Sequence, residues 1–323
     1  MKKVIVRRGR RFLLFVETGT RDEDYQKYED LRQEIWEEPD DHFSGRRNMA
    51  GENYFSCGGS LFTGAYSEDE NGRITRRPEQ FVGFTYGYVG AMDKSIGYRR
   101  RDNLHFYSQY AAVHEDVRRF GLGSALKHHQ ADAVQNILGV DVISCTFDPL
   151  TGVNANRNIH KLGMRVEKYI ASCYRNFGGR LNREDIPSDR FYVTWDLRDR
   201  RQKPVSLDSK KLTAEAAWAL RARTAQIKGS GGRMEIQVPG QKIGTSGDLE
   251  SDLVLVEIPG DFYRMLQSTD TGNPTVRRIP LEWRMASRRV FSLLMECGFR
   301  VFDFQRLTLE GRVRNVYVLK KKV

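Results

Sequence analysis

Alternating hydrophobic and polar residues mark several short stretches of the chain as strands that bury one face. In residues 103–113, Leu104 and Phe106 alternate with His105 and Tyr107. The same pattern, or a short apolar run, predicts further strands at 60–67, 80–90, 140–148, 165–175 and 190–197, and one or two strands within residues 1–20.

Helical periodicity separates these strands. Residues 22–38 carry acidic side chains in the first turn, where the helix dipole favours them. Residues 121–138 place five apolar side chains on one helical face: Leu122, Ala125, Leu126, Ala133 and Ile137. A shorter helix within 149–163 ends at Gly163, a residue suited to the position after a helix. This order of elements predicts an α/β fold around a mixed sheet.

The remainder of the chain is predicted as a second part. A helix is expected at 212–227, and residues 228–252 form a loop that includes a strand at 233–239. A strand at 252–259, a helix at 281–298 and strands at 299–307 and 314–322 then follow. We therefore predict a first domain at 1–200, a linker at 201–210 and a C-terminal domain at 211–323, which packs on the first domain or extends it.

The C-terminal pattern repeats the earlier order of strand, helix ending in glycine, strand, strand. The segments "HKLGMRV" and "MECGFRV" match best. A degenerate internal repeat explains this, and so does coincidence, because such pieces are common. The second copy lacks any R-x-x-G-x-G loop, so it carries no phosphate site of its own.

Composition narrows the class of protein. The chain has 323 residues, of which 39% are hydrophobic, and no apolar run long enough to span a membrane. Its four cysteines are scattered without C-x-x-C spacing, and no metal-ligand motif occurs. We expect a cytoplasmic protein with reduced thiols and no metal. The net charge of +11 favours an anionic partner, but no nucleic-acid recognition motif accompanies it.

One loop concentrates candidate chemistry. The stretch "RRFGLGSA", residues 118–125, lies between a predicted strand and a predicted helix. The first N–H groups of a helix have no partner within it, and the helix dipole adds positive charge there. Gly121 and Gly123 allow close approach to the backbone, and Arg118 and Arg119 add full charge. This combination suits a pyrophosphate.

The loop also carries a resemblance. "YAAVHEDVRRFGLGSAL" contains R-x-x-G-x-G and resembles motif A of the GNAT superfamily of acyl-CoA-dependent N-acyltransferases. The order of elements over residues 1–197 is similar to that fold. "FDPL", "LG" at 162–163 and "PSDR" at 187–190 resemble a less-studied GNAT-like group that has a second, C-terminal half.

The resemblance implies a fold and a ligand. The strand ending at Val113 would separate from the next strand, and the pantetheine arm of acetyl-CoA, or of another short acyl-CoA, would lie beside it. Backbone groups of Ala111 and Val113 would bind that arm, and a free N–H near Val113 would stabilise an oxyanion. The residues implied in cofactor binding are Ala111, Val113, Arg118, Arg119, Phe120, Gly121, Leu122, Gly123, Ser124, Asn154 and Asn158.

The implied reaction is direct attack of an amine, borne on a small molecule or a peptide, on the thioester in a ternary complex. The tyrosine that usually acts as acid in the family falls on Ile159, so water would protonate the thiolate. Candidates for a catalytic role are His105, Tyr107, Gln109, His114, Glu115, Tyr169 and Tyr174. His105, Tyr107 and Gln109 are expected to share one face of their strand.

Several residues keep two interpretations. Asn154 and Asn158 share a helix face and bind pantetheine or a water, or Asn154 caps the helix. Asn182, Asp189 and Arg190 line the acceptor side, or form a turn with a surface ion pair. For the whole chain the alternatives to an enzyme are a non-catalytic module that binds CoA or a partner, and a nucleic-acid binder.

Overall fold

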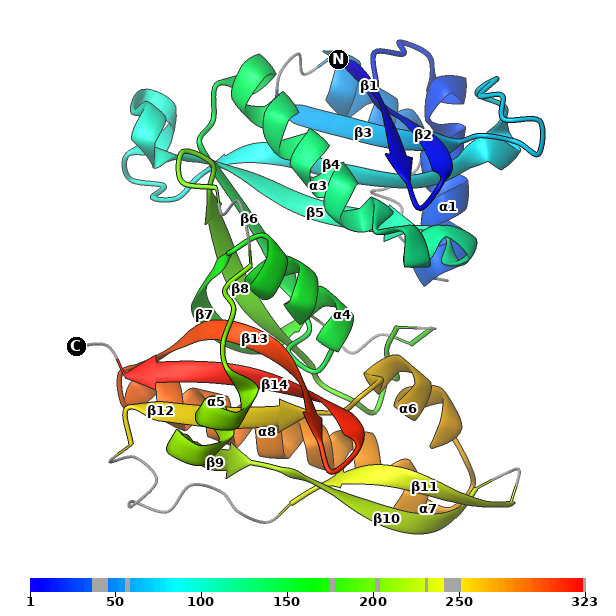
Figure 1. The fold of residues 1–323 in the computed structure, drawn as a ribbon. Helices are drawn as coiled ribbons and strands as arrows, with labels where there is room; N and C mark the ends of the chain where they lie inside the picture. Colours follow the sequence, from blue (N-terminus) through cyan, green and yellow to red (C-terminus); the bar gives the residue numbers. More distant parts are fainter. Residues whose placement is uncertain are drawn as a thin grey trace. The chain divides into compact units, whose positions relative to one another are not determined.

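The computed structural model describes residues 1–36, 46–55, 59–174, 178–179, 181–200, 204–229, 232–240 and 251–321 (Figure 1). Its contacts divide the chain into two units. Unit 1 comprises Met1–Cys145 with Trp195–Asp199, and unit 2 comprises Thr146–Thr194 with Arg200–Val323. Residues 146–194, which the sequence assigned to the first domain, therefore group with the C-terminal half. The predicted domain boundaries say which parts of the chain fold independently, and they remain a prediction.

The larger sheet has eight strands in the order β1-β2-β3-β4-β5-β6-β8-β7 (Figure 1). The pairs from β1 to β5 are antiparallel, and β5 pairs with β6 in parallel. All the strands predicted within 1–197 are present. Their bounds are β1 Lys2–Arg7, β2 Arg10–Val16, β3 Ser60–Ser67, β4 Phe81–Ala91, β5 Leu104–Val113, β6 Val142–Phe147, β7 Arg165–Tyr174 and β8 Ser188–Asp196.

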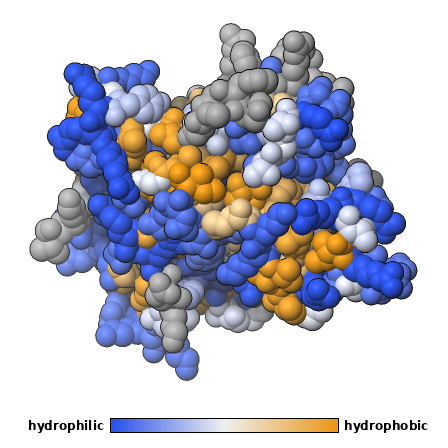
Figure 2. Space-filling view, turned by 90° about the horizontal axis from the view of Figure 1, so that it is seen from above, coloured by the Kyte–Doolittle hydropathy of each residue, from blue (hydrophilic) through white to orange (hydrophobic). Residues whose placement is uncertain are grey.

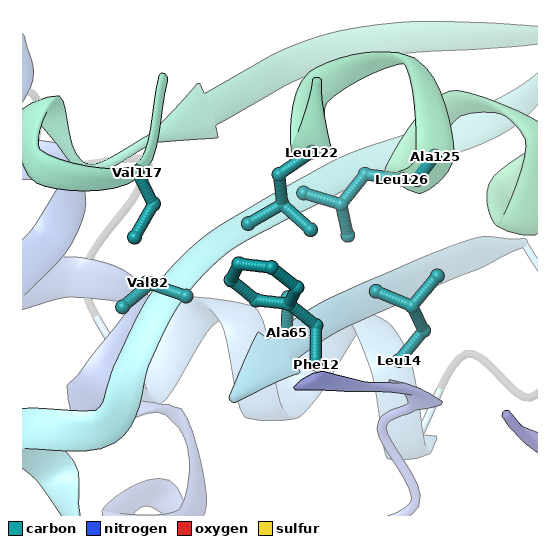
Figure 3. Packing of buried hydrophobic residues seen from close by; sticks show 8 residues of the cluster. All are labelled: Phe12, Leu14, Ala65, Val82, Val117, Leu122, Ala125 and Leu126. Atoms are coloured by element: carbon teal, nitrogen blue, oxygen red, sulfur yellow. The ribbon is translucent and has the colours of Figure 1, made fainter. Parts of the chain in front are cut away.

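Helices cover both faces of the sheet in unit 1. On one face, α3 (Leu122–Ala133) packs onto β2, β3 and β4 through eight buried residues that Figure 3 shows: Phe12, Leu14, Ala65, Val82, Val117, Leu122, Ala125 and Leu126. On the other face, Tyr28 of α1 (Gln26–Trp36) contacts the rings of Phe62, Phe81 and Phe84. A short helix α2 (Arg46–Ala50) continues as one wider helical turn at Gly51–Phe55.

The predicted apolar face of α3 is right for four residues and wrong for the fifth. Leu122, Ala125, Leu126 and Ala133 are buried, whereas Ile137 is 51% exposed. The last turn, Val134–Leu138, is a π-helix, which has more residues per turn than an α-helix. This change of period rotates Ile137 away from the sheet.

Gly64 of β3 is one of the positions where the sheet leaves no room for a Cβ atom. A Cβ atom there would lie 2.6 Å from Cζ of Phe15 and 2.8 Å from Cε2 of Phe81. We expect Gly64→Ala to lower the free energy of unfolding by about 1–3 kcal/mol, the usual cost of overpacking a core. Urea denaturation measures this. Gly272→Ala, where no atom lies within 4 Å, is the control and should stay near wild type.

Unit 2 contains the second, smaller sheet, in the order β13-β14-β12-β9, and a separate hairpin of β10 and β11 (Figure 1). Its strands are β9 Ala217–Leu220, β10 Ala222–Gly229, β11 Gly232–Pro239, β12 Leu253–Ile258, β13 Phe299–Leu309 and β14 Arg312–Lys321. Its helices are α4 Gly152–Ala155, which continues as a π-helix to Lys161, α5 Ser209–Glu215, α6 Phe262–Ser268, α7 Pro274–Arg277 and α8 Ile279–Glu296.

The helix predicted at 212–227 is wrong. The chain forms α5, which ends at Glu215, and then the two strands β9 and β10. Alanine-rich composition favours a helix, but β9 pairs in parallel with β12, and β10 pairs with β11 through eight residues. β12 is distant in sequence and β11 follows β10 in a hairpin, and the backbone hydrogen bonds with these partners override local propensity.

The strand order of the second sheet agrees with the predicted repeat. The strands β5-β6-β8-β7 and β9-β12-β14-β13 lie in the same order, each with a parallel first pair and an antiparallel last pair. The helix before β7 and the helix before β13 are each followed by a glycine with positive φ, Gly163 at +70° and Gly298 at +87°. Both sets therefore repeat one topology.

The surface mixes hydrophilic and hydrophobic residues, and Figure 2 shows apolar side chains between hydrophilic ones on one face. Val4 and Val6 of the outer strand β1 are among the exposed large hydrophobic residues. Within the described residues, no helix combines the length and hydropathy that crossing a bilayer requires. Cys145, Cys173 and Cys297 are free thiols, and Cys57 lies outside the described residues.

Candidate functional site

The loop before α3 is built around Gly121. A short 3₁₀ helix, Glu115–Phe120, which the sequence did not predict, comes directly before it. Gly121 has φ of +73°, a conformation that residues with a Cβ rarely adopt, and no atom lies within 4 Å of the position its Cβ would take. The next residue, Leu122, is fully buried in the core of Figure 3, so it fixes the start of α3 to the sheet.

Positive charge surrounds this helix start. The first N–H groups of α3, from Leu122, Gly123 and Ser124, are those that a helix leaves without internal partners. Arg118 and Arg119 are exposed at the end of the 3₁₀ helix. The Arg119 guanidinium lies 5.3 Å from the ring centre of Phe120. Residues 118–124, predicted to bind a pyrophosphate, thus run from two exposed arginines through Gly121 into the first turn of α3, where only Leu122 is fully buried.

The strand before the loop has an edge that β6 does not use. The parallel pairing between β5 and β6 consists of Phe106 with Ile143 and Tyr107 with Ser144. Beyond Tyr107, β5 continues to Val113, paired with β4 only in the described part of the chain. The predicted separation of the two strands is therefore present. The Val113 carbonyl accepts a hydrogen bond from Arg118 Nε at 3.2 Å, and the His114 N–H donates to Val82.

A β-bulge corrects the predicted face of β5. Tyr86 of β4 pairs with Tyr110, but the next residue, Gly87, pairs with Ser108. Gln109 is the extra residue, and it is exposed. Because side chains alternate along a strand, the bulge moves Gln109 off the face that His105 and Tyr107 share.

Tyr110 takes the place that Gln109 was expected to occupy. Tyr110 stacks with Tyr86 at 6.2 Å, Tyr107 contacts Tyr88 at 5.8 Å, and Tyr86 contacts Tyr88 on the same strand. Trp36 of α1 also contacts Tyr110, at 5.3 Å. We call Tyr86, Tyr88, Tyr107 and Tyr110 the tyrosine face. Its opposite side is closed, since Ser108 hydrogen-bonds Lys127 and Gln130 of α3.

His105 lies where β5 and β6 join. Its Nδ1 is 2.6 Å from the hydroxyl oxygen of Ser144 on β6. Of the other candidates near this strand, Glu115 is exposed at the start of the 3₁₀ helix, and the Nε2 atom of His114 is 3.2 Å from the Glu34 carboxylate. Burial lowers the pKa of His105 below its ordinary value. A neutral imidazole that can accept a proton therefore faces the end of the paired region.

The lowered pKa of His105 has a measurable consequence. The unfolded chain takes up a proton at this residue near pH 6.5, before the folded chain does, so folding should weaken as the pH falls below about 6.5. We expect an NMR titration of His105 to give a pKa below about 6.5. We also expect His105→Asn to reduce the loss of stability on acidification. A titration midpoint at or above the ordinary value would contradict the burial seen here.

Asn154 and Asn158 lie in unit 2 and bind the same arginine. The Arg157 guanidinium donates from Nη2 to Asn154 at 2.8 Å and from Nε to Asn158 at 3.1 Å. The two asparagines therefore share a face, as the spacing predicted. Asn154 is inside α4, where Thr151 precedes the helix, so it is not the cap. Ile159, where the resemblance implies that a tyrosine would stand, is buried.

Two of the three residues predicted for the acceptor side, Asp189 and Arg190, are part of a buried ionic network in unit 2. Asp189 is fully buried and pairs with Arg288 of α8, so the alternative of a surface ion pair is wrong. It also accepts hydrogen bonds from the Tyr169 hydroxyl at 2.5 Å and from the Ser172 N–H at 2.9 Å. Burial raises the pKa of Asp189, but these hydrogen bonds together lower it below its ordinary value. The carboxylate is a fixed anion.

The same network fixes Tyr169. Burial, together with the negative charge of Asp189, raises the pKa of Tyr169 far above its ordinary range, so the hydroxyl keeps its proton. Tyr174 is 43% exposed, and its hydroxyl is 2.8 Å from Thr146 Oγ1. Asn182 is buried and donates to the Ile186 carbonyl, which is the turn expected as its second interpretation.

A second buried carboxylate completes the network. Asp148 follows β6, and Arg284 of α8 binds it with both Nη groups, one of them at 2.9 Å. Arg190 lies 3.6 Å from the same carboxylate and stacks on Tyr174. Arg284 is fully buried. The sequence alone did not indicate Arg284 or Arg288, because both belong to a helix more than ninety residues away from their partners.

Comparison with known proteins gives similar solved structures. The NatC complex bound to Gag peptide and CoA is 14% identical, covers 57% of this chain and 98% of its own, and has a TM-score of 0.40. Arabidopsis thaliana NAA60 with a bisubstrate analogue is 13% identical over 57% and 97%, with a TM-score of 0.40. Mutant forms of SpeG, a spermidine/spermine N-acetyltransferase from Vibrio cholerae, are 12% identical over 57% and 94%, with a TM-score of 0.40.

No family model and no curated protein sequence matches the chain. The order of elements, the separation of β5 from β6 and the glycine loop at the start of α3 nevertheless agree with the resemblance seen in the sequence. Residues 1–197 contain the predicted α/β order of elements around a mixed sheet.

Proposed function

We propose that the chain is an N-acyltransferase that transfers an acyl group, most simply acetyl, from acyl-CoA to an amine of a small molecule or peptide. The observation that carries this proposal is Gly121, which opens the start of α3 beside Arg118 and Arg119. N–H groups from Leu122 to Ser124 and these guanidinium groups fit a pyrophosphate in charge and access. The family relationship of the chain to the GNAT superfamily is part of the same proposal.

The free edge of β5 fits the rest of the ligand. From Ser108 to Val113 the strand extends by about 17 Å, at about 3.3 Å per residue. Backbone groups along this edge, including those of Ala111 and Val113, would hold an extended amide-containing arm. Bound acyl-CoA supplies an activated acyl group. Its reactive end would lie near Tyr107, where β5 and β6 join, so an oxyanion donor would come from that end of β5 and not from the N–H near Val113.

The same geometry suggests how the amine is handled. The face of β5 toward α3 is filled by Lys127 and Gln130, so the amine would arrive over the tyrosine face. His105 would accept the proton that the amine loses as its nitrogen bonds the acyl carbon. The sulfur leaves as thiolate, and water protonates it. Tyr169 is an unsuitable acid for the thiolate because it is bound to Asp189.

A thermal-shift titration with acetyl-CoA tests the binding half of the proposal. Ligand at 100 times its dissociation constant should raise the free energy of unfolding by about 2.7 kcal/mol. CoA and adenosine diphosphate are run beside it, because both share the pyrophosphate. Release of free thiol with a panel of amines then tests transfer. No shift at millimolar acetyl-CoA would reject the proposal.

The second candidate is a module that binds CoA without catalysis. The buried Ile159 at the position of the family's tyrosine, and the engagement of Tyr169 by Asp189, favour it. The two candidates differ in one result. A saturable shift with acetyl-CoA, but no thiol release with any amine, would favour the binding module.

A further inference from the structure

The hairpin of β1 and β2 carries positive charge without compensation in its own sequence. Residues 1–16 contain six lysines and arginines and no aspartate or glutamate: Lys2, Lys3, Arg7, Arg8, Arg10 and Arg11. The turn is formed by Arg8 and Gly9, both with positive φ. The register places Arg7 directly opposite Arg10. Like charges opposite each other destabilise a strand pair, so this arrangement needs a reason.

Arg10 extends from this hairpin to the candidate site. Its Nε donates to the hydroxyl of Ser67 at 2.7 Å, which fixes the guanidinium beside β3. The guanidinium lies 5.7 Å from the ring centre of Phe120, the residue before Gly121. Arg119 lies over the same ring at 5.3 Å, and Phe12 contacts its edge. Phe120 therefore holds two guanidinium groups next to the start of α3.

These arginines differ from others in the chain. Arg11 lies near Glu68, and Arg100 and Arg198 each pair with an aspartate two residues away. Among the residues that the structure describes, no carboxylate pairs with Arg10, Arg118 or Arg119. Two of these guanidinium groups, from Arg10 and Arg119, lie over the ring of Phe120 and repel one another, and an anionic ligand with more than one charged group would offset this repulsion.

We infer that Arg10 binds the 3′-phosphate of the adenosine part of CoA and makes the protein selective for 3′-phosphorylated ligands. This inference rests on the proposed function. Arg118, Arg119 and the N–H groups of α3 are sufficient for a pyrophosphate. Arg10 comes from a different strand, and Ser67 engages only its Nε. Its two Nη groups present the fork that binds a phosphate by two hydrogen bonds.

Calorimetric titration with CoA and with 3′-dephospho-CoA tests the inference. A hydrogen-bonded ion pair is commonly worth a factor of about ten or more in affinity, so wild type should bind CoA about tenfold or more tightly than dephospho-CoA. Arg10→Gln should weaken CoA binding by the same factor and leave dephospho-CoA unchanged, so the ratio falls to about one. Arg10→Lys keeps the charge and should keep part of the ratio.

Arg11→Gln is the matched control, since Arg11 is the next residue of β2 and lies near Glu68. It should keep the wild-type ratio. Equal affinity of wild type for the two ligands, or an unchanged ratio in Arg10→Gln, would overturn the inference while leaving the proposed function intact. If neither ligand binds wild type, the proposed function itself fails, and the assignment of Arg10 fails with it.

Discussion

Replacing Arg284 with alanine is expected to lower the free energy of unfolding by about 3–5 kcal/mol, because Asp148 would remain buried without its main partner. Arg284 is fully buried, and its two Nη groups bind both carboxylate oxygens. Arg190, 3.6 Å from one of those oxygens, compensates only in part. Urea denaturation followed by circular dichroism measures the change.

Two further variants show whether the buried charge is the cause. Arg100→Ala breaks an exposed pair with Asp102 and should cost less than about 1 kcal/mol. Arg284→Met combined with Asp148→Asn removes both charges, so it should be less destabilising than Arg284→Ala alone. If Arg284→Ala costs no more than Arg100→Ala, the Asp148–Arg284 pair is solvated and the description of unit 2 is wrong.

Gly121→Glu should weaken acetyl-CoA binding by about a factor of 100. Two unit charges about 5 Å apart repel by about 3 kcal/mol at an effective dielectric constant of about 20, which corresponds to that factor in Kd. The added carboxylate would stand at the start of α3, where a pyrophosphate is expected. Titration calorimetry, or loss of the thermal shift, measures the effect.

The control for this variant is Gly311→Glu in the turn between β13 and β14. Gly311 has the same φ of +73° and likewise no atom within 4 Å of a Cβ position. Both variants carry a similar backbone strain of about 1–2 kcal/mol and the same added charge. Only Gly121→Glu should lose the ligand. Equal loss in both would mean that the effect is general destabilisation and that the loop is not the site.

The fold within 1–197 was predictable where local pattern and tertiary structure agree. The short strand-like segment of β3 and the alternation of β5 need only neighbouring residues, and both strands appear with nearly the expected bounds. The pattern failed at 212–227, where alanines favour a helix but β12 and β11 provide strand partners. The predicted burial of Ile137 was wrong for another reason: it lies in a π-helical turn, which sequence periodicity does not reveal.

The candidate site likewise contains some residues that the sequence could indicate and others that it could not. Residues 118–124 form one contiguous loop, so a motif could find them. Tyr110 enters the tyrosine face only because Gln109 is bulged, and Arg10 reaches Phe120 through the pairing of β2 with β3. Such residues depend on strand register, which a single sequence leaves open.

The ionic network of unit 2 also affects how this chain can evolve. Its carboxylates, Asp148 and Asp189, are encoded before residue 200, and their partners, Arg284 and Arg288, are encoded after it. Recombination that joined residues 1–200 to a foreign C-terminal segment would leave two anions buried without cations. Selection would therefore keep the two segments together as one heritable block, in which the acidic and basic positions change only in concert.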